Sequence, residues 1–241
     1  TPLYSSAASD VYKRQRRRNP SMLMNLIKNE FLLEMKSSNN LFYMTFFSLS
    51  CLMLSVFSFP PSELNEIIIL SGFFWIIIAL VSIKLIENSF VREKEMGIYD
   101  LIYTSPTENY LIFLAKLVTF SSILLGVQLF IFMIYSLIST AIEIDLIFKI
   151  LMLCLLSNMG LIGLGIIIYL MTSLNSTRSF LFPLILFPII VPLLIQSSNI
   201  FIALCLGKEI SFYAESLLLL STFGLMAVIL GINFFERLIK Y

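Results

Sequence analysis

The sequence contains no histidine, and this absence excludes several classes of enzyme. Histidine is the usual general base at neutral pH and a common ligand of metals and haem. Without it, a Ser-His-Asp hydrolase and an HExxH metalloprotease are both excluded. The sequence also lacks a GxxxxGK[ST] phosphate-binding loop, so we expect no ATPase site in this chain. We therefore expect no catalytic residue, no metal site and no directly bound cofactor.

Charged residues are scarce as well. They make up 13% of the chain, whereas apolar residues make up 59% and the mean hydropathy is +0.94. A soluble domain carries about 25% charged residues, so the lipid bilayer is the expected solvent. The net charge of +1 gives no reason to expect a nucleic-acid partner. The composition predicts an all-α polytopic membrane protein.

Cysteine is rare too, and its spacing fits neither a CxxC pair nor a zinc site. The three cysteines lie far apart, each in an apolar run: Cys51, Cys154 and Cys205. We expect them to be buried, reduced thiols.

Apolar runs of about 20 residues, the length that a helix needs to cross a bilayer, recur along the chain. We expect about six transmembrane helices, with five or seven as alternatives, at residues 41–59, 67–83, 111–138, 146–171, 180–196 and 216–235. Residues 200–206 are too short to span, so they either continue the fifth span or form a re-entrant segment. The role of residues 197–215 is left open.

A helical pattern also precedes the first span. Leu23, Leu26, Ile27 and Phe31 fall at helical spacing, with polar residues between them. The pattern predicts an amphipathic helix lying in the cytoplasmic interface. An extension of the first span is the alternative.

Residues 1–21 differ in character from the rest, because they are polar and basic. The stretch SSAASDVYKRQ is typical of translated library-adapter sequence, so we expect the natural chain to begin at Met22 or Met24. A native disordered basic tail is the alternative. Residues 22–241 are expected to form a single transmembrane domain.

The orientation follows from Lys and Arg near the span ends, which favour the cytoplasmic side. Nine such residues lie in alternate loops beginning with the N-terminus, against two in the opposite loops: Lys28, Lys36, Lys84, Arg92, Lys94, Lys116, Arg178, Arg237 and Lys240, against Lys149 and Lys208. Both termini are therefore expected in the cytoplasm, with the protein in a bacterial inner membrane. An organellar inner membrane is the alternative.

The longest polar segment, residues 84–116, lies between the second and third expected spans. Its charges are mixed, so attraction to anionic lipid explains it poorly. The pattern predicts a helix, a break at Gly97, and a short apolar-faced helix that ends at Ser105 and Pro106. Such a surface could dock a cytoplasmic partner. A solvated connecting loop is the alternative.

Several residues within the expected spans also suggest a role. Three prolines lie in the fifth span, and they are a candidate hinge or an architectural kink: Pro183, Pro188 and Pro192. Three glycines in the fourth span favour close helix approach: Gly160, Gly163 and Gly165. Gln128 and Asn158 are expected to hydrogen-bond across helices, with the lining of a path as the alternative. No charged residue falls near the middle of a span, which counts against a proton-coupled carrier.

Two segments resemble known families. FVREKEMGIYDLIYTSPTENYLIFLAK is similar to the segment after the second span of ABC-2-type permeases, where an acidic residue (Glu93 or Glu95) and a glycine (Gly97) precede a short amphipathic helix. A Ser/Thr-Pro pair and a lysine, here Lys116, follow in that family. SLNSTRSFLFPLILFPIIVPLLIQSS resembles the haem exporter protein B family (CcmB), in which a basic turn leads into a span with a Pro-x-x-x-Pro pattern. The resemblance covers Met24 to Tyr241 and departs at residues 196–198, where a smaller, Gly-containing exit is expected.

The resemblance implies the permease subunit of an ABC transporter for haem delivery or export in c-type cytochrome biogenesis. It implies a separate cytoplasmic ABC ATPase, docked through a coupling segment that contains Arg92, Glu93, Glu95, Gly97, Asp100, Ser105 and Pro106. Other implied partners are further cytochrome c maturation membrane proteins and a haem chaperone, and a second copy of the chain could form a homodimer. Haem would be a cargo of the complex.

Three alternatives remain at this point. One is another ABC-2-type exporter, of a drug, a polysaccharide or a lipid. A second is an assembly scaffold that transports nothing. The third is an intramembrane enzyme, which would need catalytic groups clustered at a common depth.

Overall fold

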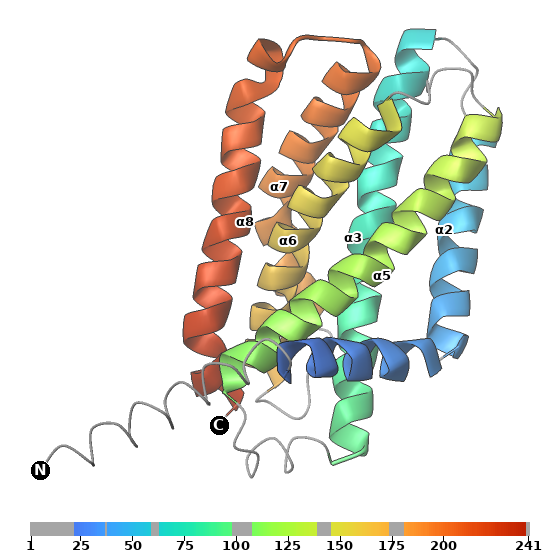
Figure 1. The fold of residues 1–241 in the computed structure, drawn as a ribbon. Coiled ribbons are helices and arrows are strands. Elements are labelled where there is room, and N and C mark those ends of the chain that lie inside the picture. Colours follow the sequence, from blue (N-terminus) through green and yellow to red (C-terminus); the bar gives the residue numbers. More distant parts are fainter. Residues whose placement is uncertain are drawn as a thin grey trace, which may run out of the picture.

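The computed structural model describes residues 22–36, 38–58, 63–97, 108–138, 146–173 and 181–239, and all regular structure in these ranges is helical. A helix of residues 22–36 comes first. The later helices are α2 (Ser38–Ser58), α3 (Glu63–Glu95), α5 (Asn109–Ile138), α6 (Leu146–Ser173), α7 (Leu181–Cys205) and α8 (Ile210–Ile239). The predicted all-α class is confirmed (Figure 1).

Within the described ranges, five helices are long and apolar enough to cross a membrane: Ile67–Glu95, Asn109–Ile134, Leu146–Thr172, Leu181–Cys205 and Ile210–Phe235. The apolar part of α2, Phe42–Ser55, is shorter than these. Figure 1 shows α2 beside the other long helices and running alongside α3. The arrangement confirms a multi-pass helical membrane protein, with α2 as the sixth candidate span.

We call the end at which α3 and α8 finish, and at which α5 and α7 begin, the base of the bundle. The helix of residues 22–36 lies across this base at a steep angle to α2 (Figure 1). It therefore does not continue the first span as a straight extension. Its side chains Leu23, Leu26 and Ile27 are half-buried, whereas Phe31 is exposed.

Two helices extend beyond the spans expected within them. The second span was expected at about residues 67–83, and α3 continues as a helix to Glu95, close to the predicted break at Gly97. At 33 residues α3 is about 50 Å long, longer than the roughly 30 Å hydrocarbon core. The first part of the expected polar loop, residues 84–95, is therefore a rigid extension of a span.

The fifth span was expected at about residues 180–196, with residues 200–206 as its continuation or a re-entrant segment. α7 runs on to Cys205, which confirms the continuation. Gly207, at φ +63°, ends the helix. The Lys208 N–H donates to the Ala203 carbonyl at 2.9 Å, and the Gly207 N–H donates to the Leu204 carbonyl at 3.1 Å. These bonds satisfy carbonyls that the helix end would leave free. α8 begins soon after, at Ile210, and its backbone departs from helical geometry at Tyr213 (φ −119°, ψ 15°), shortly before the expected start of the last span at residue 216.

The prolines of α7 have different positions in the helix. Pro188 and Pro192 lie inside it, where each removes a backbone donor. Pro183 is the third residue of α7 and lies in the first turn. Its missing N–H costs no hydrogen bond there, because the N–H groups of a first turn have no partner within the helix. α7 continues through all three to Cys205, and a hinge role for them stays a prediction.

The glycines of α6 bring its neighbours close, as predicted. A Cβ added to Gly160 would lie 2.5 Å from Leu193 Cδ1 and 3.6 Å from the Gly224 Cα of α8. A Cβ at Gly163 would lie 3.0 Å from the Ala227 Cβ, and one at Gly165 would overlap Ile86 of α3. Small residues matter here because lipid gives apolar helices little drive to associate, so close packing holds them together.

We predict that Gly231→Ala destabilises the bundle. A Cβ at Gly231 on α8 would overlap the ring of Phe113 on α5, which is fully buried. Overpacking of this kind costs about 1–3 kcal/mol, so the thermal unfolding midpoint in detergent should fall. Phe113→Leu in the same chain should restore part of it. The matched control is Gly126→Ala, whose Cβ would meet nothing within 4 Å. Equal midpoints for the two alanine variants would contradict the packing.

We also predict the orientation of the base. In a chain whose native cysteines are replaced by alanine, Glu209→Cys in the α7–α8 turn should react with an impermeant maleimide in intact cells. Met96→Cys, exposed at the base, should react only after permeabilisation, because the Lys and Arg bias places the base in the cytoplasm. The reverse labelling pattern would show the opposite topology.

Candidate functional site

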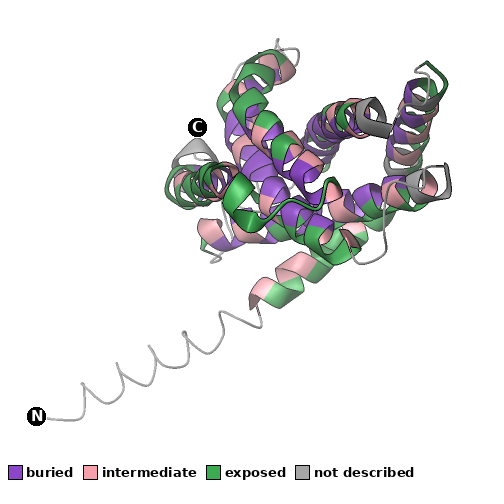
Figure 2. Ribbon diagram, turned by 90° about the horizontal axis from the view of Figure 1, so that it is seen from above, coloured by how far each residue is buried: buried purple, intermediate pink, exposed green. Residues whose placement is uncertain are grey.

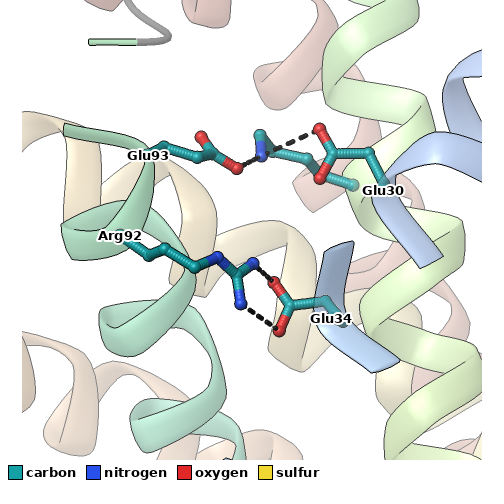
Figure 3. Close-up of polar contacts among 5 residues, drawn as sticks. Glu30, Glu34, Arg92 and Glu93 are labelled. Carbon is teal, nitrogen blue, oxygen red and sulfur yellow. Dashed lines mark hydrogen bonds and ion pairs between the residues drawn. The ribbon is translucent and has the colours of Figure 1, made fainter. Parts of the chain in front are cut away.

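Five charged side chains meet at the base of the bundle (Figure 3). Glu30 and Glu34 come from the helix of residues 22–36, Arg92 and Glu93 from the last turn of α3, and Lys116 from the second turn of α5. Three of them are almost fully buried: Glu34 and Lys116 are 1% exposed and Glu93 is 2% exposed. Charged residues are rarely buried so far unless they are paired. We call these five residues the base network.

Lys116 is the centre of the base network. Its Nζ lies 3.1 Å from Glu30 Oε1 and also pairs with Glu93 Oε1. The same ammonium lies 5.0 Å from the ring centroid of Phe90 and 5.7 Å from that of Phe120. Burying an ammonium costs several kcal/mol, which these carboxylates and aromatic faces offset. One side chain thereby fixes α5 to both α3 and the N-terminal helix.

Arg92 and Glu34 form the second connection. Both terminal guanidinium nitrogens of Arg92 donate to the carboxylate of Glu34, Nη1 to Oε2 at 3.4 Å and Nη2 to Oε1. A two-point pair of this kind fixes orientation as well as distance. It holds the end of α3 against the N-terminal helix.

The charges of the base network do not balance. Three carboxylates face two cations, and the second oxygens of Glu30 and Glu93 are buried without a hydrogen-bond partner in the described part of the chain. The network therefore has more acceptors than donors.

The base network contains part of the predicted coupling segment. It includes Arg92 and Glu93, but Glu93 points inward to Lys116 instead of outward (Figure 3). Glu95 and Gly97 are exposed next to it. Gly97 has φ +66°, and its N–H donates to the Lys94 carbonyl at 3.2 Å, so the helix breaks where the sequence predicts. Asp100, Ser105 and Pro106 lie outside the described residues.

Sequence reasoning missed Glu30 and Glu34. Their spacing of four residues puts both carboxylates on one helix face, which was the available signal. A helix predicted to lie in the membrane interface gives its carboxylates no expected partner on another helix.

A second polar feature joins four helices inside the bundle. Gln128 and Asn158 form two amide hydrogen bonds, of 3.0 and 2.9 Å, between α5 and α6. The hydroxyl pair Ser157–Ser197 at 2.8 Å joins α6 to α7, and the pair Ser71–Ser198 at 2.8 Å joins α3 to α7. We call this set the polar belt.

The polar belt confirms the predicted cross-helix bonding of Gln128 and Asn158. Both are fully buried, and each amide uses a donor and an acceptor on the other. Their bonding therefore supports an architectural role. The two serines of α7 occupy positions where the family resemblance led us to expect smaller residues.

Neither feature is arranged as a metal site. Within the described ranges, no group of three or more Cys, Asp or Glu side chains is placed to hold a metal ion. Lys116 is a resident cation in the base network, so the carboxylates already serve as its counter-ions. The base network is suited to joining helices.

A family model described as CcmB protein matches residues 21–236, which is most of the chain. A comparison with curated proteins gave no match. The family match agrees with the resemblance that the sequence motifs carry.

We predict that Lys116→Met strongly destabilises the protein. It leaves the Glu93 carboxylate buried without a cation, which typically costs about 3–5 kcal/mol, and the thermal midpoint in detergent should fall accordingly. Adding Glu93→Leu should recover much of the loss, because the stranded charge is then removed. The control is Lys84→Met, since the Lys84–Glu87 pair at 3.2 Å is exposed and such pairs contribute about 0–1 kcal/mol. Similar losses for Lys116→Met and Lys84→Met would contradict the burial of the network.

Proposed function

Because this chain belongs to the CcmB family, we propose that it is the membrane-spanning permease subunit of an ABC transporter that serves c-type cytochrome maturation. The observation that carries the proposal is the family match over residues 21–236. The helices long enough to span a bilayer support a permease. The sequence has no phosphate-binding loop, so a separate cytoplasmic ATPase would supply the energy.

We propose that the ATPase docks at the base, on the segment from Arg92 to Ser105. The exposed side chains at the end of α3, Lys94, Glu95 and Met96, would meet the partner directly. Glu93 would act differently from our first expectation. Since it is buried against Lys116, it would hold the end of α3 in place and would not touch the ATPase.

Haem is proposed as a cargo of the complex, together with partner membrane proteins of cytochrome c maturation and a haem chaperone. A chain without histidine could ligate haem only through Met, Tyr or Cys. We place the protein in a bacterial inner membrane with both termini in the cytoplasm, from the Lys and Arg bias. A homodimer would give the two docking surfaces that a pair of ATPase subunits needs.

Two measurements test the function. The tagged chain, purified in mild detergent from its own host, should carry an ABC ATPase identifiable by mass spectrometry. A deletion strain should lose covalent haem on its c-type cytochromes, seen by haem staining of a gel. Intact cytochromes with lost drug resistance or altered surface polysaccharide would point to another ABC-2-type exporter. Co-purification without any stimulated ATP hydrolysis in proteoliposomes would point to a scaffold.

We predict that Gly97→Val and Glu95→Lys weaken ATPase binding without affecting insertion. A β-branched residue at φ +66° costs roughly 1–3 kcal/mol of strain and would redirect the segment. Reversing an exposed charge should cost less, about 0.2–1 kcal/mol. Binding is measured by co-purification and titration of the ATPase. The control, Glu209→Lys, lies in the exposed turn at the opposite end and should bind normally. Normal binding by both base variants would make this segment a simple connector.

A further inference from the structure

The helix of residues 22–36 has little apolar contact with the bundle. Within this range Glu34 is the one fully buried residue, and Leu26 is the residue that packs against the hydrophobic core. Met24, Leu32 and Met35 are all exposed. In Figure 2 the helix that follows the grey N-terminal trace shows mostly the colours of intermediate and exposed residues. A helix held by packing would fully bury an apolar stripe, whereas Leu23, Leu26 and Ile27 are only half-buried, so apolar packing is a small part of the attachment.

Two carboxylates supply these contacts. Glu30 and Glu34 lie one turn apart on the inner face and reach two different helices (Figure 3). Glu30 pairs with Lys116 of α5 at 3.1 Å, and Glu34 pairs with Arg92 of α3 at both guanidinium nitrogens. The N-terminal helix is thus attached to α3 and α5 chiefly through charge.

A charged attachment behaves differently from an apolar one. Well-packed apolar residues often hold a buried contact as firmly as ion pairs, or more firmly. An ion pair near the end of a span, however, can separate and let water solvate each charge, whereas separated apolar surfaces would remain exposed. Lys116 would also keep its pair with Glu93 of α3 when the N-terminal helix and Glu30 move away.

We propose that the helix of residues 22–36 is a latch, fastened to the bundle by Glu30 and Glu34 and released when the end of α3 moves. Arg92 lies in the last turn of α3, so a displacement of that turn would withdraw the guanidinium from Glu34. That an ATPase causes this displacement rests on the proposed function. The latch itself concerns this chain alone.

The test measures the position of the helix in the purified chain, without any ATPase. In a chain with alanine at the native cysteine positions, nitroxide labels at Lys28→Cys and Met171→Cys report the distance from the helix to the base of α6 by double electron–electron resonance. Glu30→Gln with Glu34→Gln removes both ion pairs and keeps Lys116 paired with Glu93, so the bundle should stay folded. The main distance should shift by more than about 5 Å, the rise of one helical turn.

Two further variants separate charge from packing. Leu26→Ala trims the apolar contact and should leave the native distance unchanged. Glu34→Arg places like charges together and should release the helix, whereas Glu34→Arg with Arg92→Glu should restore the native distance. A native distance in the double glutamine variant, or release by Leu26→Ala alone, would overturn the latch. Neither result depends on whether the chain binds an ATPase or serves cytochrome maturation, so the two proposals fail separately.

Discussion

The buried ammonium of Lys116 is the contact on which the arrangement of the base depends. α5 begins only seven residues earlier, at Asn109, so Lys116 lies just inside the bundle. There it pairs with carboxylates from two other helices and rests against two aromatic rings. Lys116 thus connects three helices that are distant in the sequence.

The two polar features differ in chemistry because they lie at different depths. The polar belt uses only amides and hydroxyls, whose burial is tolerable once each is hydrogen-bonded. The base network uses full charges, which would be far more costly near the bilayer centre. Hydrogen bonds between neutral groups therefore join the helices inside the bundle, and ion pairs join them at its base, where Lys94 is exposed.

The sequence predicts the helical class and the approximate spans, because long apolar runs have few alternatives to a transmembrane helix. It also predicts the break of α3 at Gly97, because the helical pattern of residues 84–96 stops at a residue that tolerates positive φ. Glycine packing on α6 and the Gln128–Asn158 pair were predictable from residue type and depth. The pairing of Glu30 and Glu34 could not be predicted. It depends on the angle at which the N-terminal helix crosses the base, and the spacing of apolar residues along one helix does not determine that angle.

The turn that joins α7 to α8 has a consequence for how the chain enters the membrane. Only residues 206–209 separate the two helices, and the turn is closed by its own backbone bonds around Gly207. α7 and α8 are the long apolar helices with the largest outward-facing share, so lipid can solvate them before the rest is assembled. The pair can partition from the translocon as one helical hairpin, carrying across only the opposite charges of Lys208 and Glu209. Its later docking on α6 then requires no further crossing of the bilayer, only lateral approach along the surface that Gly160 and Gly224 leave open.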